Sequence, residues 1–174
     1  MSEPVVLKGR GLVGGVAEGE ALVTREAISG WGGVEPRRGR VIESRHELVG
    51  QSFAGKVLVF KGAKGSSGWS GMFHMSRLLG SAPAAMVFTT MNTKIALGVV
   101  VTRVPALTDL DGDPFEVIHT GDWVRVDADR GLLTVTPHGG SATGNPGRRV
   151  QAQGSMVDSD AAAQGRALAE ELDP

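Results

Sequence analysis

The segment from residue 56 to residue 79, KVLVFKGAKGSSGWSGMFHMSRLL, decides the fold predicted for this chain. Its apolar start, Val57–Phe60, is typical of a buried strand, and Gly62–Gly68 forms a glycine-rich turn before methionines and leucines at helical spacing. The segment therefore predicts a strand, a tight loop and a helix. Free backbone N–H groups and the positive end of the helix dipole meet at such a helix start. That place suits a substrate carboxylate or phosphate, or a serine oxygen that must carry negative charge.

The residues that follow predict a βαβ unit with a right-handed crossover. Gly80 suits the end of the helix, and Pro83 prevents its continuation. Residues 84–88 (AAMVF) are typical of a second buried strand. A strand, a helix and a strand in this order favour parallel pairing of the two strands.

The next stretch predicts shorter elements. We expect Asn92 to cap a short helical turn that ends near Leu97. The run Val99–Val101 is typical of another buried strand, and residues 105–107 (PAL) lead into a turn. Asp109, Asp111 and Asp113 in that turn resemble the opening of a calcium loop, but no glutamate stands at its twelfth position and Pro114 breaks the geometry, so a surface turn is favoured.

The two ends of the globular region favour β structure. Residues 5–24 predict two strands joined at Gly14-Gly15, with Glu18 and Glu20 on a solvated face of the second strand. Residues 121–136 predict a hairpin with period-two alternation.

A loop rich in glycine and arginine separates these regions. In residues 28–36 (ISGWGGVEP), Trp31 either closes a hairpin or Ω-loop over the core, or the glycines present backbone N–H groups to a pocket. Four arginines follow, and we expect them to face solvent. His46 is interpreted as a loop or capping residue. The arginines are Arg37, Arg38, Arg40 and Arg45.

Composition limits the possible functions. The 174 residues allow one domain, over 1–137, followed by a flexible tail over 138–174 in which residues 161–172 favour a helix. A formal net charge of −1 gives no argument for nucleic acid or a membrane surface. No apolar run is long enough to cross a membrane, so we expect a soluble cytoplasmic protein. The chain has no cysteine, which excludes disulfides and thiolate metal sites within it.

The order of its motifs resembles the swivel domain of aconitase X, the small subunit of a two-subunit hydro-lyase in much of that family. The similarity runs over roughly residues 5–135 and is specific as an ordered set. The matching motifs are Gly15–Val23, Ile28–Val34, Lys64–Ser67, Ala82–Ala85, Ala96–Gly98 and Gly121–Gly131.

The resemblance implies an α/β fold, specifically a swivelling β/β/α domain with a central helix behind a glycine-serine loop. It implies a large partner subunit, in a heterodimer or larger assembly, that holds iron or an iron–sulfur cluster. No cofactor or metal is expected in this chain itself. The substrate would be a small hydroxy acid, with cis-3-hydroxy-L-proline placed first and mevalonate 5-phosphate as the alternative.

The resemblance also assigns the site residues. Ser66, the first serine after the glycine of the K-G-S turn, is expected to be the catalytic base, and helix capping is left to Ser67. Trp69 departs from the family pattern by placing an indole next to the serine turn, and no acidic residue stands near Asn92-Thr93. The residues expected to contact substrate are Lys64, Gly65, Ser67, Gly32 and Gly33.

Two functions of other classes stay open. A phosphohistidine carrier would need a histidine at the helix start, but His74 falls about two turns further along. A non-catalytic regulatory or scaffold subunit would retain only the fold.

Overall fold

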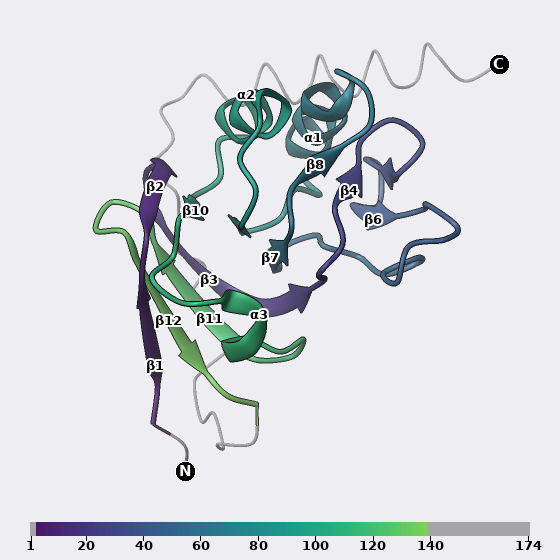
Figure 1. Ribbon diagram of the computed structural model, residues 1–174. Coiled ribbons are helices and arrows are strands. Elements are labelled where there is room, and N and C mark those ends of the chain that lie inside the picture. Colours follow the sequence, from purple (N-terminus) through teal and green to yellow (C-terminus); the bar gives the residue numbers. More distant parts are fainter. Residues whose placement is uncertain (1–2, 139–174) are drawn as a thin grey trace, which may run out of the picture.

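The computed structural model describes residues 3–138, and the predicted tail, apart from His138, lies outside the described residues, so the boundary at 137 stays a prediction. One sheet of eight strands in the order β1-β12-β11-β3-β7-β9-β10-β2 organises this region (Figure 1). Its strands are β1 (Val5–Lys8), β2 (Arg10–Val13), β3 (Val16–Val23), β7 (Val57–Phe60), β9 (Ala85–Phe88), β10 (Ala106–Thr108), β11 (Trp123–Asp127) and β12 (Leu132–Thr136).

The predicted βαβ unit is confirmed. Strand β7 pairs in parallel with β9, and helix α1 (Trp69–Leu78) connects them. The chain leaves the helix through Gly80, whose φ of 76° is the left-handed conformation common after a helix. The N–H of Ser81 then donates to the carbonyl of Ser76 at 2.8 Å, which satisfies one of the free carbonyls at the helix end.

The predicted strand over Val99–Val101 is wrong, because these residues belong to helix α2 (Thr93–Thr102). The cap at Asn92 is confirmed, since its side chain accepts a hydrogen bond from the N–H of Ile95 at 3.0 Å. Ile95, Val99 and Thr102 are buried on one helical face, and α2 packs against α1. Tertiary packing therefore overrides the β preference of a valine run.

The region that follows α2 also differs from the expectation. Residues 105–107 are expected to lead into a turn, but strand β10 (Ala106–Thr108) begins within them. It pairs with β9 in parallel and with β2 in antiparallel orientation. The short helix α3 (Pro114–Val117) comes next, capped by the side chain of Asp113. The three aspartates are exposed in a surface turn, as predicted. Two of them also bind the distant N-terminal segment: Asp109 pairs with Arg10, and Asp111 accepts from the N–H of Lys8.

The N-terminal region forms three strands instead of the two predicted. A single extended segment is divided at Gly9 into β1, which pairs with β12, and β2, which pairs with β10. These strands occupy the two edges of the sheet order, so the sheet curls back on itself at Gly9. A Cβ on Gly9 would lie 2.7 Å from the carbonyl oxygen of Thr108, so the close approach at this point requires glycine.

The hairpin of β11 and β12 and the solvated face of β3 agree with prediction. Trp123 pairs with Thr136 and Asp127 with Leu132 in an antiparallel register. Glu18 and Glu20 are exposed on β3.

Two apolar clusters lie on opposite faces of the sheet. The first is covered by α1 and α2, which lie side by side over that face (Figure 1), and it contains the stacked rings of Phe53, Phe73 and Trp69. The second cluster includes Val59 and Val126, and Phe115 and Val117 of α3 pack against it.

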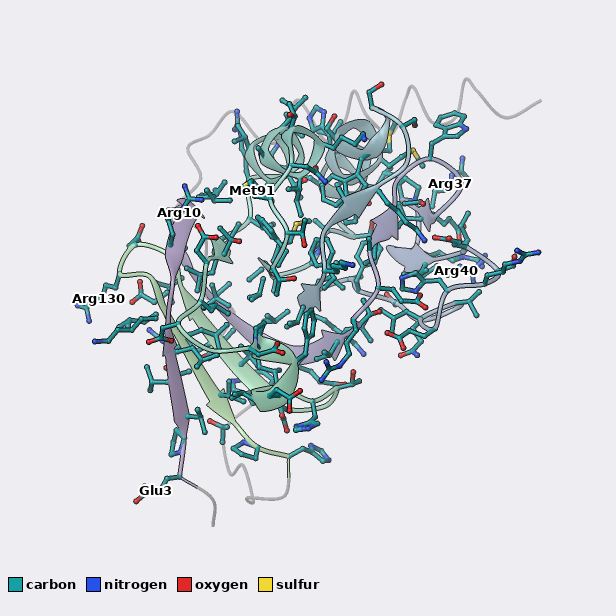
Figure 2. All side chains as sticks on the ribbon, in the orientation of Figure 1. Glu3, Arg10, Arg37, Arg40, Met91 and Arg130 are labelled. Carbon is teal, nitrogen blue, oxygen red and sulfur yellow. The ribbon has the colours of Figure 1, made fainter. Side chains whose placement is uncertain are left out.

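A small lobe is attached beside the first cluster. It contains two short sheets, formed by β4 (Ile28–Ser29) with β8 (Ala63–Lys64) and by β5 (Val34–Glu35) with β6 (Arg40–Val41). Figure 2 shows Arg37 and Arg40 at this end of the molecule, far from Arg130 and Glu3. Arg37, Arg38 and Arg45 are exposed as expected, whereas Arg40 is half-buried against Glu35.

His46 caps a turn in the same lobe, as its sequence context predicted. Its Nδ1 accepts a hydrogen bond from the N–H of Leu48 at 3.1 Å, and the side chain is buried. Across residues 3–138, none of the helices has both the length and the hydropathy needed to span a bilayer.

A serine turn as candidate active site

The predicted serine turn lies at the surface, directly before α1. Strand β8 ends at Lys64, and the chain reverses at Gly65, whose φ of 86° lies in the left-handed region. Ser66 and Ser67 are both exposed. The hydroxyl of Ser66 is therefore accessible to a substrate, which a catalytic role requires.

Backbone groups at the start of α1 face Ser66. The N–H of Gly68 donates to Ser66 Oγ at 3.4 Å, and the N–H of Trp69 donates to the carbonyl of Ser66 at 3.4 Å. Gly68 is the N-cap residue and no side chain caps the helix, so the expected cap by Ser67 is wrong. Because no side-chain oxygen neutralises this helix terminus, its dipole favours negative charge at the nearby Ser66 oxygen.

The glycine loop at residues 29–33 packs against the serine turn. Ile28 and Ser29 of β4 pair in parallel with Ala63 and Lys64 of β8. The glycine loop that follows β4 therefore begins next to the serine turn that follows β8. A Cβ added to Gly30 would lie 2.3 Å from the Cα of Trp69. Only glycine permits this approach, and the two loops form one surface.

The loop's own hydrogen bonds limit what it can offer a ligand. The N–H groups of Gly33 and Val34 both donate to the carbonyl of Gly30, at 3.0 and 3.1 Å. The N–H of Gly33 is thus already satisfied, and the structure does not present it to a substrate. Gly32 is exposed, with a φ of 73°.

The two tryptophans near the turn exchange their expected roles. Trp31 does not close over the core: it is 77% exposed, and its Cβ lies 3.5 Å from the position that a Cβ on Gly68 would occupy. Trp69 is 0% exposed and stacks on Phe73, with ring centroids 4.3 Å apart. The indole beside the serine turn is therefore that of Trp31, because the first turn of α1 directs Trp69 into the core.

Lys64 has a partner that the sequence analysis missed. Its Nζ lies 2.8 Å from Oε1 of Glu43, whose side chain is 28% exposed. Glu43 is distant in sequence and stands after a basic stretch, so no local pattern indicated the pair. Its carboxylate offsets the charge of Lys64, and the field at Ser66 thus depends mainly on the backbone of α1.

Asn92 fixes the strand below the turn. Its Nδ2 donates to the carbonyl of Ala63 at 2.8 Å, while its Oδ1 caps α2. The helix-cap pattern in the sequence identified the second role, but only the folded chain reveals the first.

The arrangement can bind an anionic group and support a charged serine oxygen. It places an exposed hydroxyl at an uncapped helix start, and Lys64 lies two residues before that hydroxyl in the same turn. In residues 3–138, no three His, Cys, Asp or Glu side chains come together in a way that could hold a metal ion. His74 is exposed on α1, away from the helix start that a carrier histidine would occupy.

A curled sheet covered by two helices, with a serine turn opening onto the first helix, defines a swivelling α/β domain of the aconitase type. The model of the aconitase X swivel domain family matches residues 6–135, and the chain belongs to this family. It is accordingly a subunit of a hydro-lyase, an enzyme that removes water from its substrate.

Named relatives extend the similarity over the same region. The phosphomevalonate dehydratase small subunit of Methanosarcina mazei is 38% identical over 136 residues, which is 78% of this chain and 94% of the relative. The protein of the same name from Methanothrix thermoacetophila is 42% identical over 127 residues, covering 72% and 90% of the two chains. A crystal structure of Thermococcus kodakaraensis aconitase X in its holo-form matches with a TM-score of 0.72 and 38% identity, over 76% of this chain and 99% of the other.

Proposed function

We propose that this chain is the small subunit of a two-subunit dehydratase that acts on mevalonate 5-phosphate, with Ser66 as the base. The observation that carries the proposal is the exposed Ser66 hydroxyl at the uncapped start of α1, within a domain that matches small subunits named for this substrate. These relatives favour the phosphorylated substrate over cis-3-hydroxy-L-proline, which the sequence analysis placed first.

The geometry supports proton removal by Ser66. A serine hydroxyl is a weak base in water and needs surroundings that stabilise its alkoxide. The N–H of Gly68 and the dipole of α1 provide them, because both direct positive charge toward Oγ. The alkoxide takes the proton from the carbon α to the substrate carboxylate, and a double bond forms between the α and β carbons. The β oxygen leaves with the electrons of its C–O bond, takes the proton back from the Ser66 hydroxyl and departs as water, which restores the alkoxide.

The exposure of this face supports a site that another subunit completes. Ser66, Ser67 and Trp31 are all exposed, so in this chain alone they do not enclose a substrate. We infer that the large subunit covers this face and binds most of the substrate. With no cysteine in the chain and no cluster of metal-binding side chains in its described part, an iron centre would also belong to the large subunit.

The test is a side-by-side assay of the assembled enzyme. The chain is co-expressed with its large subunit, and water loss from mevalonate 5-phosphate and from cis-3-hydroxy-L-proline is followed with the Ser66→Ala assembly as the blank. Turnover of the phosphorylated acid at a kcat/KM at least about a hundredfold higher supports the proposal. Preference for the hydroxyproline refutes the substrate, and turnover by the blank refutes the role of Ser66.

A further inference from the structure

We propose that Glu43 is a positioning residue that holds the Lys64 ammonium beside the serine turn for the anionic group of the substrate. This inference rests on the proposed function, since it assigns Lys64 a substrate-binding role in that same site. The anionic group is a carboxylate or a phosphate, because either accepts the N–H donors of an ammonium.

The Glu43 side chain extends from a well-anchored backbone. The carbonyl of Gly33 accepts from the N–H of Ile42 at 2.9 Å and from the N–H of Glu43 at 3.4 Å. Gly33 is itself bonded to Gly30, so Glu43 is tied to the loop that packs on the serine turn. Its carboxylate therefore starts from a fixed point next to the site.

The two oxygens of this carboxylate are not equivalent. Oε1 contacts the Nζ of Lys64 at 2.8 Å, whereas Oε2 is buried and has no hydrogen-bond partner. A buried carboxylate oxygen without a donor is unfavourable unless a nearby positive charge compensates it. The Lys64 ammonium, 2.8 Å from the other oxygen of the same carboxylate, supplies such a charge. The pairing ties the position of one side chain to that of the other.

Lys64 keeps the capacity to bind a second anion. Its ammonium has three donors, of which the contact with Glu43 uses one, and its side chain is 43% exposed. The residue stands two positions before Ser66, on a strand fixed by Asn92 and by pairing with Ser29. Holding a long, flexible side chain in place reduces the entropy lost when it binds a substrate.

The experiment is a double-mutant cycle in the assembled enzyme with mevalonate 5-phosphate. Glu43→Ala should raise KM about tenfold and lower kcat less than about threefold, because a binding contact and not the base is disturbed. Adding Glu43→Ala to Lys64→Ala should cause no further change, since Glu43 acts only through Lys64. Additive effects, or a KM within about twofold of wild type for Glu43→Ala, would overturn the proposal.

Two variants separate positioning from a general loss of structure. Glu43→Gln keeps an oxygen that accepts from the ammonium and should return KM to within about threefold of wild type. Glu20→Ala removes a different carboxylate–lysine pair, that with Lys56 at 3.5 Å, and should leave KM unchanged. A Glu43→Gln assembly as impaired as Glu43→Ala contradicts positioning through this contact.

A measurement without substrate distinguishes this inference from the proposed function. The full-length chain is acetylated with limiting acetic anhydride, and modification of Lys64 is compared with that of Lys56 by mass spectrometry. Glu43→Ala should raise the modification rate of Lys64 at least about threefold with Lys56 unchanged, because the amine is no longer held in an ion pair. An unchanged rate overturns the Glu43 proposal. An inactive wild-type assembly with the expected labelling refutes only the substrate.

Discussion

The indole Nε1 of Trp69 donates a hydrogen bond to the carbonyl oxygen of Ile28, 2.9 Å away and 41 positions earlier in the chain. Trp69 is the first residue of α1, and Ile28 begins the strand that leads into the glycine loop. Together with the β4–β8 pairing, this bond ties the start of α1 to the strand that leads into the glycine loop. The buried ring below it stacks on Phe73 and contributes to the core at the same time.

Replacing this tryptophan should loosen the site and the core together. Trp69→Phe leaves the Ile28 carbonyl without its donor and removes buried ring volume, so we expect the free energy of unfolding to fall by about 2–4 kcal/mol. Trp123→Phe, at a tryptophan 49% exposed on β11, is the matched control and should change it by less than about 0.5 kcal/mol. Urea denaturation of the full chain measures both, and equal losses would contradict the role assigned to Trp69.

Gly98 on α2 lies against the indole ring of Trp69 and lets α2 pack closely on α1. A Cβ there would lie 2.1 Å from Cζ3 of Trp69, so Gly98→Ala should cost about 1–3 kcal/mol by forcing the indole to move. Gly71 on α1 has no atom within 4 Å of such a Cβ, and Gly71→Ala should stabilise the chain by about 0.5–1 kcal/mol. Thermal melts of the two variants should therefore shift in opposite directions.

The variants Ser66→Ala and Ser67→Ala should differ in kcat, although neither substitution should destabilise the fold. Ser66→Ala removes the proposed base and should lower kcat by a factor of about 100 or more, with assembly intact. Ser67→Ala should keep its melting temperature within about 1 °C, because Ser67 caps no helix. Its kcat should stay at least about tenfold above that of Ser66→Ala, and similar losses for both would place the base elsewhere.

Trp31 should matter for assembly and not for stability. Its side chain is 77% exposed beside the serine turn. Tryptophans that become buried when two proteins bind commonly anchor the interface. Trp31→Ala should weaken binding of the large subunit by about thirtyfold, or about 2 kcal/mol, measured by titration calorimetry or by gel filtration at falling concentration. Without the large subunit, the unfolding curve of the Trp31→Ala chain should match that of the wild-type chain. Unaltered affinity would show that the large subunit does not cover this face.

Asn92 allows its two bonds to be tested separately. Asn92→Ala loses both the cap of α2 and the bond to the Ala63 carbonyl, and should cost about 2 kcal/mol. Asn92→Asp keeps the capping oxygen but loses the donor to Ala63, and should cost about 1 kcal/mol. Chemical denaturation measures both variants. If Asn92→Asp is as stable as wild type, the bond to β8 contributes nothing.

The local pattern of the sequence determined much of the architecture. The apolar run at residues 57–60, the glycine-serine turn and the helix after it were identified because their signals depend only on neighbouring residues. The same holds for the hairpin of β11 and β12, and for the cap at Asn92. Family resemblance then selected Ser66 from two adjacent serines that local chemistry alone did not distinguish.

The tertiary structure decided what depends on partners distant in sequence. Val99–Val101 is helical because α2 packs on α1, and the N-terminal segment divides at Gly9 because its halves pair with different edges of the sheet. Lys64 meets Glu43 only once β8 and the segment that follows β6 lie in one lobe. Periodicity records which residues prefer burial, but not which surface buries them, so these contacts form only in the folded chain.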